Sequence, residues 1–383
     1  SHIGHSLQNL ECHVGNFSIE ALSGALDPTW VADALETTKS ASKRTRDLPA
    51  DLMVWLVIAM GLYRRLSIRN VWSRLSEGFR GKLRTLRKKK PSSSALTQAR
   101  RRLGYAALRE LFTRFAGALS TRFSSMHRWR GLTVMAMDGT TGKAPDSKAN
   151  RARFGAPASD RGESAYPFVR LVTLVAVHTR IVLGAAICGW CTGEVPLAMT
   201  LVAALNPKSL VLMDRGFLSY GLLWAITRRQ SHFLVRGRRG LSLRKRQRLG
   251  RGDWLAEIRV PRKVRKAHPE MPMVWLVRVI HYRVPGFRSR YLITSLLDPI
   301  AYPAEELALL YHARWEQEIA YDEIKTHLVS SPVPFRSQKP LGVYQEAYGL
   351  LIAYNLVRAL IAEASAMTDI PPSRISFVDS LEI

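Results

Sequence analysis

The feature of the sequence that constrains the fold most is a change in the period of its apolar residues near residue 131. Before this point apolar residues recur at helical spacing, in LPADLMVWLVIAMGLYRRL, IRNVWSRLSEGF, ALTQARRRL and ALRELFTRFAGAL. After it come three strand-like runs, LTVMAMDGT, YPFVRLVTLVAV and RIVLGAAICGW. They are followed by helix EVPLAMTLVAAL, strand SLVLMD, helix FLSYGLLWAITRRQ and strand HFLVRGR. This order predicts a mixed α/β layer with an antiparallel meander, preceded by an all-helical region.

The chain is strongly basic. Its 383 residues are 47% hydrophobic and include 57 Lys and Arg against 30 Asp and Glu, a formal net charge of +27. A globular chain with this excess of positive charge is expected to bind a polyanion. The runs Lys82–Lys90 and Arg100–Arg102 are interleaved with short helices. We therefore predict that residues 1–130 form a helical DNA-binding domain.

A second concentration of positive charge lies in residues 236–251, which contain eight basic residues and no acid. The strand-like pieces WLAEIRV and PMVWLVRVIHYRV follow it. We predict a basic, strand-rich insertion over residues 237–290, with a flexible solvated loop as the alternative for the basic run. The candidate DNA contacts in these two basic regions are Arg100, Arg101, Arg244, Lys245 and Arg246.

We expect a soluble, intracellular protein. The longest apolar run, Leu52–Tyr63, is shorter than the roughly 20 residues needed to cross a bilayer. The first 38 residues contain no Lys or Arg, unlike a signal peptide. An odd, low number of cysteines, Cys12, Cys188 and Cys191, suits a reducing cytoplasm. Cys188 and Cys191 have the spacing of half a zinc site or a redox pair, but no second pair lies near, so we interpret them as structural.

Two aspartates follow apolar strand runs. Asp138 comes after LTVMAM and Asp214 after SLVLM, each with a glycine within two residues. A carboxylate at the carboxyl end of a buried strand faces a crevice and can be approached closely by a ligand. We therefore predict that both strands end at these aspartates and present them to a common site.

A third acid lies on a predicted helix. The stretch LYHARWEQEIAYDEIK, residues 310–325, contains no Gly or Pro and is predicted to form one helix. Helical spacing places Tyr311, Arg314, Glu318 and Lys325 on one stripe. Apolar Leu310, Ile324 and Leu328 flank one side of the stripe, and Trp315 and Ile319 the other. Such a stripe indicates a face that looks into a cleft; a solvated face with ordinary ion pairs is the alternative.

Three converging carboxylates imply a bound cation. Asp138, Asp214 and Glu318 would repel one another unless positive charge lay between them. Mg²⁺ or Mn²⁺, two per active site, suits carboxylate oxygens and assists in-line displacement at phosphorus. Hydrolysis or transfer at a DNA phosphate fits both the acids and the basic charge.

These residues resemble a known family, the DDE transposases of bacterial insertion sequences, and in particular the insertion-sequence-four group. The signature of that group is Tyr, two residues, Arg, three residues, Glu, six residues, Lys, and Tyr311, Arg314, Glu318 and Lys325 match it in full. The pieces DGT, DRGF, YLITSLLDP and QEAYGLLIAYNLVR, and the amino-terminal helices, also resemble the group. The similarity covers nearly the whole chain.

The resemblance implies an RNase H-like catalytic core, in which Asp138, Asp214 and Glu318 bind the metal ions. The core would comprise residues 131–236 and 291–335, the second part with the catalytic helix, interrupted by the β-rich insertion over 237–290. Residues 336–383 would form a carboxyl-terminal helical region with a possible role in dimerisation. Arg314, Lys325 and the hydroxyl of Tyr311 are implied to bind DNA phosphates. Arg215 is a further candidate, with an ordinary ion pair as its alternative.

Hairpin-forming relatives hold a flipped base against an aromatic residue, and in direct register this sequence has Arg290 at that position. The aromatic candidates that remain nearby are Phe287, Tyr291, Trp254 and Trp275. The sequence leaves open whether excision passes through a hairpin.

The function implied is cut-and-paste transposition: two-metal hydrolysis at transposon ends, then attack of the 3′ hydroxyl on target DNA. The implied partners are the terminal inverted repeats, target DNA and a second copy of the chain in a paired-end homodimer, with no membrane. The implied location is the bacterial cytoplasm, in association with the nucleoid. The alternatives are a catalytically silent DNA-binding regulator derived from a transposase, and an RNase H-like nuclease without strand transfer.

Overall fold

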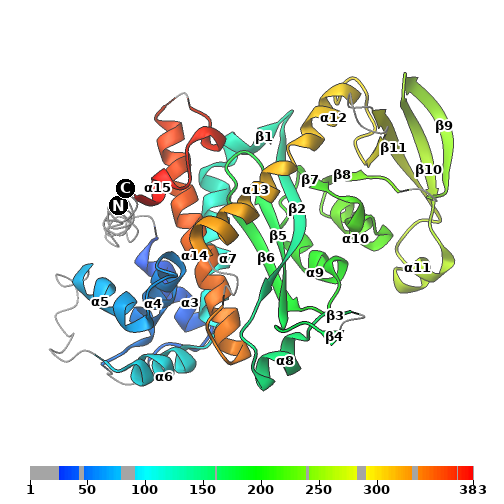
Figure 1. The fold of residues 1–383 in the computed structure, drawn as a ribbon. Helices are drawn as coiled ribbons and strands as arrows, with labels where there is room; N and C mark the ends of the chain where they lie inside the picture. Colours follow the sequence, from blue (N-terminus) through cyan, green and yellow to red (C-terminus); the bar gives the residue numbers. More distant parts are fainter. Residues whose placement is uncertain are drawn as a thin grey trace, which may run out of the picture. The chain divides into compact units, whose positions relative to one another are not determined.

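The computed structural model describes residues 26–42, 47–78, 91–159, 162–238, 241–282, 290–329, 335–368 and 370–382 (Figure 1). The chain divides into two compact units. Unit 1 takes residues up to Phe123, residues 141–169 and residues from Ala320 onward, and unit 2 takes residues 124–140 and 170–319. Cys12, the basic run 82–90 and Phe287 lie outside the described residues. The division into five segments that the sequence analysis gives (1–130, 131–236, 237–290, 291–335 and 336–383) stays a prediction.

Unit 1 is mainly helical. Its elements are α3 (Pro28–Thr37), α4 (Ala50–Leu62), α5 (Ile68–Gly78), α6 (Ser93–Leu103), α7 (Ala106–Arg122), α8 (Lys148–Phe154), β3 (Ala158–Ser159), β4 (Gly162–Glu163), a π-helix (Glu323–Val329), α14 (Pro340–Ala366) and α15 (Asp379–Glu382). The long α14 packs along α4 and α7. A Cβ on Gly349 would lie only 2.6 Å from Val57 Cγ1, so glycine is needed where α14 crosses α4.

Among the described residues, α14 is the helix whose length and apolar composition would allow it to cross a bilayer. However, 78% of its most apolar window is buried inside the protein. It also carries buried polar side chains, including Gln345 and Glu346. We therefore interpret α14 as the core helix of unit 1.

The carboxylate of Glu346 is buried in a ring of basic groups. Arg64 and Arg100 lie 3.3 and 3.4 Å from its oxygens, and the backbone N–H of Arg336 and the hydroxyl of Ser337 donate to it at 2.9 and 2.5 Å. Burial by itself raises the pKa of this carboxyl, but the charges of Arg100 and Arg64 and the donated hydrogen bonds bring it below its usual value. Part of the positive charge of the amino-terminal helices therefore serves to satisfy a buried acid.

Unit 2 is built on a ten-stranded sheet of order β6-β5-β2-β7-β8-β12-β11-β10-β9, with β1 paired to β2. Its strands are β1 (Arg128–Trp129), β2 (Leu132–Lys143), β5 (Phe168–Ala176), β6 (Val182–Gly189), β7 (Ser209–Met213), β8 (His232–Arg236), β9 (Leu243–Gly250), β10 (Asp253–Arg259), β11 (Val274–Tyr282) and β12 (Arg290–Thr294). Its helices are α9 (Glu194–Leu201), α10 (Tyr220–Arg228), α11 (Arg262–Ala267), α12 (Ala304–His312) and α13 (Trp315–Asp322). A few terminal residues of β2, β5 and α13 belong to unit 1.

The centre of the sheet is parallel and its far side is antiparallel. Strand β7 pairs in parallel with β2 and with β8, and β12, β11, β10 and β9 follow β8 as antiparallel neighbours. The strands of the expected basic insertion thus continue the same sheet instead of forming a second one. The prediction of a mixed α/β fold is confirmed.

The basic run ends in a regular strand. Residues Leu243–Gly250 form β9 at the edge of the sheet, so the alternative of a loop is wrong for this stretch. Arg244, Lys245, Arg246 and Arg248 are exposed on it. Charged side chains on an edge strand prevent pairing with a strand of another chain.

One arginine of the β-rich region is structural. Arg278 on β11 is fully buried and binds both carboxylate oxygens of Asp253 on β10, at 2.8 and 2.6 Å. It also donates to the carbonyl oxygens of Asp298 and Tyr302. This fork joins two neighbouring strands to the segment that leads into α12.

We expect Arg278→Met to lower the free energy of unfolding by about 3–5 kcal/mol, because it leaves the carboxylate of Asp253 buried without its partner. Urea unfolding of the full chain measures the change. Arg248→Met, at an exposed position on β9, is the matched control and should stay within about 0.5 kcal/mol of the wild type. Equal stability of the two variants would contradict a structural role for Arg278.

Candidate active site

Asp138 and Asp214 lie at one end of the parallel part of the sheet. Strand β7 ends at Met213, and Asp214 then caps a short 3₁₀ turn by accepting a hydrogen bond from Gly216 N at 2.7 Å. The prediction that a strand also ends at Asp138 is wrong, since β2 continues to Lys143. The pairing of β2 with β7 nevertheless ends at Met137 and Met213. Each aspartate therefore follows the last paired residue of one of two neighbouring parallel strands.

The predicted single helix over residues 310–325 is wrong. Helix α12 ends at His312, Ala313 and Arg314 form a turn, and α13 begins at Trp315 and gives way to the π-helix at Glu323. Neither Gly nor Pro causes the break. It coincides with tertiary hydrogen bonds on both sides: the Tyr311 hydroxyl donates to Met213 O at 3.1 Å, and Gln317 Nε2 donates to Thr173 O, also at 3.1 Å.

These contacts fix α13 on the sheet. The side chain of Gln317 is fully buried and also donates to the hydroxyl of Thr173 at 3.0 Å. Next to it, Glu316 forms an ion pair with Arg180 at 2.6 Å. These contacts of residues 316 and 317 hold the start of α13, and so fix where the backbone of Arg314 and Glu318 lies.

Arg314 joins two of the predicted metal ligands. Its Nη1 lies 3.0 Å from Asp138 Oδ2 and its Nη2 lies 2.8 Å from Glu318 Oε1. The side chains of Arg314, Asp138 and Glu318 are only 17%, 21% and 37% exposed. Asp138 and Glu318, far apart in the sequence, are thus brought together around a single guanidinium group.

The electrostatics of Asp138 indicate a crowded acidic site. Burial raises the pKa of this carboxyl to about 6, although the hydrogen bond from Gly139 N and the charge of Arg314 act in the opposite direction. The neighbouring acids Asp214 and Glu194 raise the pKa further. A carboxyl in these surroundings is stabilised by any cation that reaches it.

Glu194 is a residue of the site that the sequence did not reveal. It lies in the first turn of α9, and a Cβ on Gly139 would come within 2.5 Å of its Oε1. The absence of a side chain at Gly139 therefore lets a fourth carboxylate approach the backbone beside Asp138. Acids are frequent in the first turn of helices, so this position carried no distinctive signal in the sequence.

The donor set suits a divalent cation. Carboxylate oxygens are the ligands that Mg²⁺ and Mn²⁺ prefer, and two of the three acids already share one cation, the guanidinium of Arg314. In the part of the chain that the structure describes, no group of three His, Cys, Asp or Glu residues lies close enough to hold a metal ion. Convergence of all three acids on metal stays a prediction.

The predicted phosphate contacts differ in availability. The phosphate contact of Tyr311 is not available in this structure, because the residue is 7% exposed and its hydroxyl is bonded to Met213 O. Burial also raises the pKa of Tyr311 to about 12, so the hydroxyl remains a donor. Lys325 is exposed, with its ammonium over the ring of Tyr321, and Arg215 is exposed without an ion pair to any described residue. For Lys325 and Arg215 the phosphate contact stays a prediction.

The predicted DNA contact of Arg100 stays a prediction, but the structure gives its side chain partners inside the protein. The residue is 8% exposed, donates from Nε to Gln345 Oε1 at 3.0 Å and forms an ion pair with Glu346. Its neighbour Arg101 is exposed, as is Arg244 on β9. The contacts predicted for these two stay predictions.

The two other candidates on β9 have partners within the sheet. Arg246 pairs with Glu257 on β10 at 2.6 Å, and Lys245 lies over the ring of Trp254 at 5.2 Å. Both side chains are nevertheless exposed. Their predicted contacts with DNA stay predictions.

The aromatic candidates for holding a flipped base are partly buried. Trp254, Tyr291 and Trp275 all pack against the core of unit 2, and the hydroxyl of Tyr291 donates to the carbonyl of Arg238. The more accessible ring is that of Trp315, which the sequence placed on a packed flank and which is 61% exposed beside Arg314. The expectation that Trp315 packs is wrong, because helical spacing was extended across a helix that the structure interrupts.

The two described cysteines are free thiols. Cys188 is partly buried near the hydroxyl of Thr192, and Cys191 is exposed.

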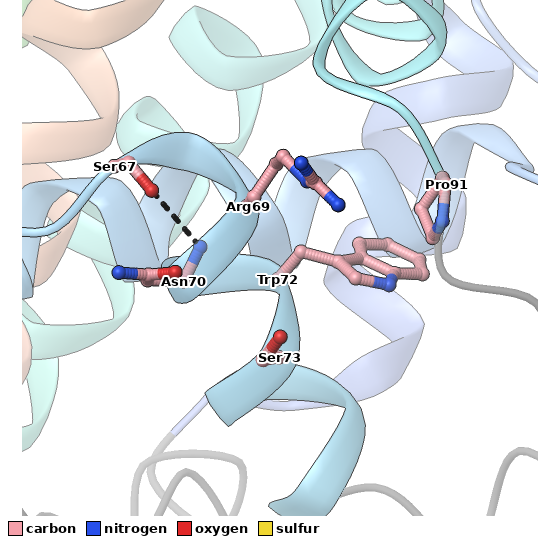
Figure 2. Close-up of a pocket in the computed structure, with 6 residues that line it drawn as sticks. All are labelled: Ser67, Arg69, Asn70, Trp72, Ser73 and Pro91. Atoms are coloured by element: carbon pink, nitrogen blue, oxygen red, sulfur yellow. Dashed lines mark hydrogen bonds between the residues drawn. The ribbon is translucent and has the colours of Figure 1, made fainter.

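A polar pocket lies in the amino-terminal helices of unit 1 (Figure 2). It has a volume of about 220 Å³ and is lined by Ser67, Arg69, Asn70, Trp72, Ser73 and Pro91. Ser67 caps α5 by accepting a hydrogen bond from Asn70 N at 3.3 Å. Arg69 and Asn70 are exposed, whereas Trp72 is only 4% exposed. The pocket thus has exposed polar side chains, Arg69 and Asn70, next to the ring of the buried Trp72.

Comparison with known proteins defines the class. Residues 129–356 match the family described as "Transposase DDE domain", and residues 16–113 match "Insertion element 4 transposase N-terminal". The chain is 32% identical over 365 residues to the transposase InsG for insertion sequence element IS4 of Escherichia coli K12, covering 94% of this chain and 81% of that protein. It is 29% identical over 225 residues to the putative transposase InsZ of the same strain, covering 57% of this chain and 71% of InsZ.

A solved chain from the piggyBac transposase synaptic complex with hairpin DNA aligns with 97% of this chain and 79% of its own length. That alignment has a TM-score of 0.44 and 13% identity, so it adds nothing to the assignment. The family matches and the relationship to InsG identify a DDE transposase. The chain belongs to the insertion-sequence-four family of these enzymes.

Arg100 and Arg101 form a matched pair for testing which basic residues touch DNA. We expect Arg101→Ala to reduce the slope of log affinity against log salt by about 0.9 on random-sequence duplex DNA, because one phosphate contact is lost. Arg100→Ala should leave this slope unchanged but lower the free energy of unfolding by about 1–3 kcal/mol, because buried acceptors lose their donor. An unchanged slope for Arg101→Ala would remove that residue from the DNA interface.

Proposed function

We propose that the protein excises and inserts a DNA element by a cut-and-paste route. As a member of its family it is a DNA transposase, an enzyme that cleaves DNA and transfers strands. The observation that carries the proposal is the meeting of Asp138 with Glu318 around Arg314, at the end of the sheet where Asp214 also follows its strand. We infer that the sheet and its covering helices form an RNase H-like core with Asp138, Asp214 and Glu318 as metal ligands.

Divalent cations bound by these acids, two per active site and Mg²⁺ or Mn²⁺ by their oxygen donors, would polarise the phosphoryl oxygen and acidify water. The chain's own residues have the other tasks. The fixed α13 orients Glu318 toward Asp138, and burial partly shields the carboxyl of Asp138 from bulk water. Arg314, Arg215 and Lys325 supply positive charge to phosphates next to the cut.

The proposed chemistry has two displacements at phosphorus. In the first, a water oxygen bonds to phosphorus at the element end and the bond from phosphorus to the 3′ oxygen breaks. One water proton passes to the leaving 3′ oxygen and the other to solvent, so that a 3′ hydroxyl and a 5′ phosphate result. In the second, the oxygen of that 3′ hydroxyl bonds to a target phosphorus, a target 3′ oxygen leaves, and the proton of the attacking hydroxyl is balanced by the proton that the leaving oxygen takes up. One phosphodiester is made for each one broken in the second step, so no external energy source is required.

The proposed partners are the terminal inverted repeats, target DNA and a second copy of the chain that pairs two ends. We infer the bacterial cytoplasm, close to the nucleoid, as the location. The other two functions considered, a catalytically silent regulator and a nuclease without strand transfer, have less support. A silent regulator would not need the acids Asp138 and Glu318, which meet around Arg314. A nuclease without strand transfer is less well supported because the chain matches the transposase DDE domain.

Replacement of Asp138, Asp214 or Glu318 by Ala should abolish cleavage, by a factor of at least about 1,000, while leaving affinity for element ends within a few-fold of wild type. Gel mapping of products from end-bearing DNA with Mg²⁺ measures cleavage and joining, and a mobility shift measures binding. Asp146→Ala, at an exposed acid of unit 1 that pairs with Arg151, is the control and should keep both. Retained strand transfer by any of the three triad variants would refute the assignment.

We infer further that the pocket on α5 contributes to recognition of the element end. It lies within the region that matches the amino-terminal family. Arg and Asn are the side chains that most often read guanine and adenine edges, and the amino-terminal residues of a helix reach those edges in many DNA-binding domains. Arg69 and Asn70 are exposed in the first turn of α5 and can act in this way.

Arg69→Ala and Asn70→Ala are expected to reduce the preference for end-bearing DNA over random DNA by about 5–100-fold, as lost base contacts do. Competition binding with the two DNAs measures the preference. Lys39→Ala removes an exposed charge that does not line the pocket and should weaken both DNAs equally, if at all. A parallel loss on both DNAs for Arg69→Ala and Asn70→Ala would mean that the pocket does not read sequence.

A further inference from the structure

Arg314 binds two carboxylates at once, with Nη1 on Asp138 Oδ2 and Nη2 on Glu318 Oε1. Both contacts are within 3.0 Å and lie in a partly buried site. Charge-assisted hydrogen bonds of this kind are about twice as strong as neutral ones. The oxygens engaged by Arg314 belong to the acids that the proposed function assigns to metal.

The backbone of Arg314 is held while its side chain remains long and rotatable. Its N–H donates to Tyr311 O at 3.2 Å and its carbonyl accepts from Gln317 N at 3.1 Å. These two backbone hydrogen bonds hold the turn between α12 and α13. Tyr311 and Gln317 are in turn bonded to β7 and β5. A change of partner at Arg314 is therefore a change of side-chain rotamer and requires no movement of α13.

A guanidinium and a divalent cation compete for the same oxygens. While Asp138 Oδ2 and Glu318 Oε1 accept hydrogen bonds from Arg314, the positive charge of the guanidinium opposes a metal ion at the same carboxylates, because the two cations repel each other. The described residues contain no three-acid group close enough to hold a metal in this arrangement. A divalent cation at these acids thus competes with Arg314 for Asp138 and Glu318.

A DNA phosphate is a suitable alternative partner for the released side chain. Guanidinium binds phosphate in the same two-pronged geometry that it uses with carboxylates. A phosphate beside the site would draw Arg314 away from the acids and leave them with uncompensated negative charge. Affinity for divalent cations would then rise, and by linkage the cation would raise affinity for DNA by the same factor.

We propose that Arg314 binds Asp138 and Glu318 until a DNA phosphate takes their place as its partner, and so couples DNA binding to metal binding. The inference rests on the proposed function, since it takes these acids as the metal ligands. It goes further by giving Arg314 two successive partners. The enzyme thereby binds its metal ions more tightly when DNA is bound.

The test measures Mn²⁺ affinity of the full chain by electron paramagnetic resonance, with no DNA present. Arg314→Gln should bind Mn²⁺ on the order of 10-fold more tightly than wild type, because the competing cation is gone. Arg128→Gln removes one exposed charge from unit 2 without touching the acids and is the matched control, expected within about 2-fold. Unchanged affinity in Arg314→Gln overturns the proposal.

The second arm adds saturating random-sequence duplex DNA. Wild type should gain on the order of 10-fold in Mn²⁺ affinity, and Arg314→Gln should gain little, since the coupling passes through this side chain. An equal gain in both proteins overturns the proposal. If Arg314→Gln does not fold, Arg314→Lys decides, because the shorter Lys side chain keeps the charge but lacks the planar two-pronged geometry of the guanidinium. Wild-type affinity and coupling in Arg314→Lys would contradict the role of the guanidinium fork.

Failure of this inference and failure of the proposed function give different results. If Arg314 does not control Mn²⁺ affinity but wild type still cleaves and joins end-bearing DNA, only the coupling is wrong. If Glu318→Ala retains strand transfer, the assignment of the acids is wrong, whatever the Mn²⁺ affinities.

Discussion

The site depends on the parallel pairing of β2 with β7. These strands end their shared ladder at Met137 and Met213, and the next residue on each is an aspartate. In parallel strands consecutive residues run toward the same end of the sheet, so the register by itself brings Asp138 and Asp214 to one place. A shift of one residue in this register would also turn the side chains of one strand to the opposite face.

The third acid is brought to the sheet by hydrogen bonds and not by the length of a helix. Tyr311 is bonded to the residue that precedes Asp214, and Gln317 is bonded to Thr173 on β5. The break at Ala313 and Arg314 lies between these two anchors. As a result, Arg314 points toward the acids, and Trp315 is exposed instead of packed.

The basic residues fall into two groups that composition does not separate. Arg100 satisfies buried partners on α14 and Arg278 joins β10 to β11, whereas Arg101 and Arg244 are exposed. An excess of positive charge predicted a polyanionic partner correctly at the level of the whole chain. It could not show which arginine is a structural partner of a buried acid, because neighbours such as Arg100 and Arg101 carry the same local pattern.

The sequence alone determined much of the order of helices and strands, the mixed α/β class, the family and three candidate acids, because periodicity, strand-end aspartates and a spaced signature are local or can be read in order along the chain. The tertiary structure decided the rest. Distant segments fixed the continuation of β2 beyond Asp138, the interrupted helix, the burial of Tyr311 and Arg100, and the approach of Glu194 to Gly139. Each of these is set by hydrogen bonds or packing between residues far apart in the chain, and local propensity contains no information about such partners.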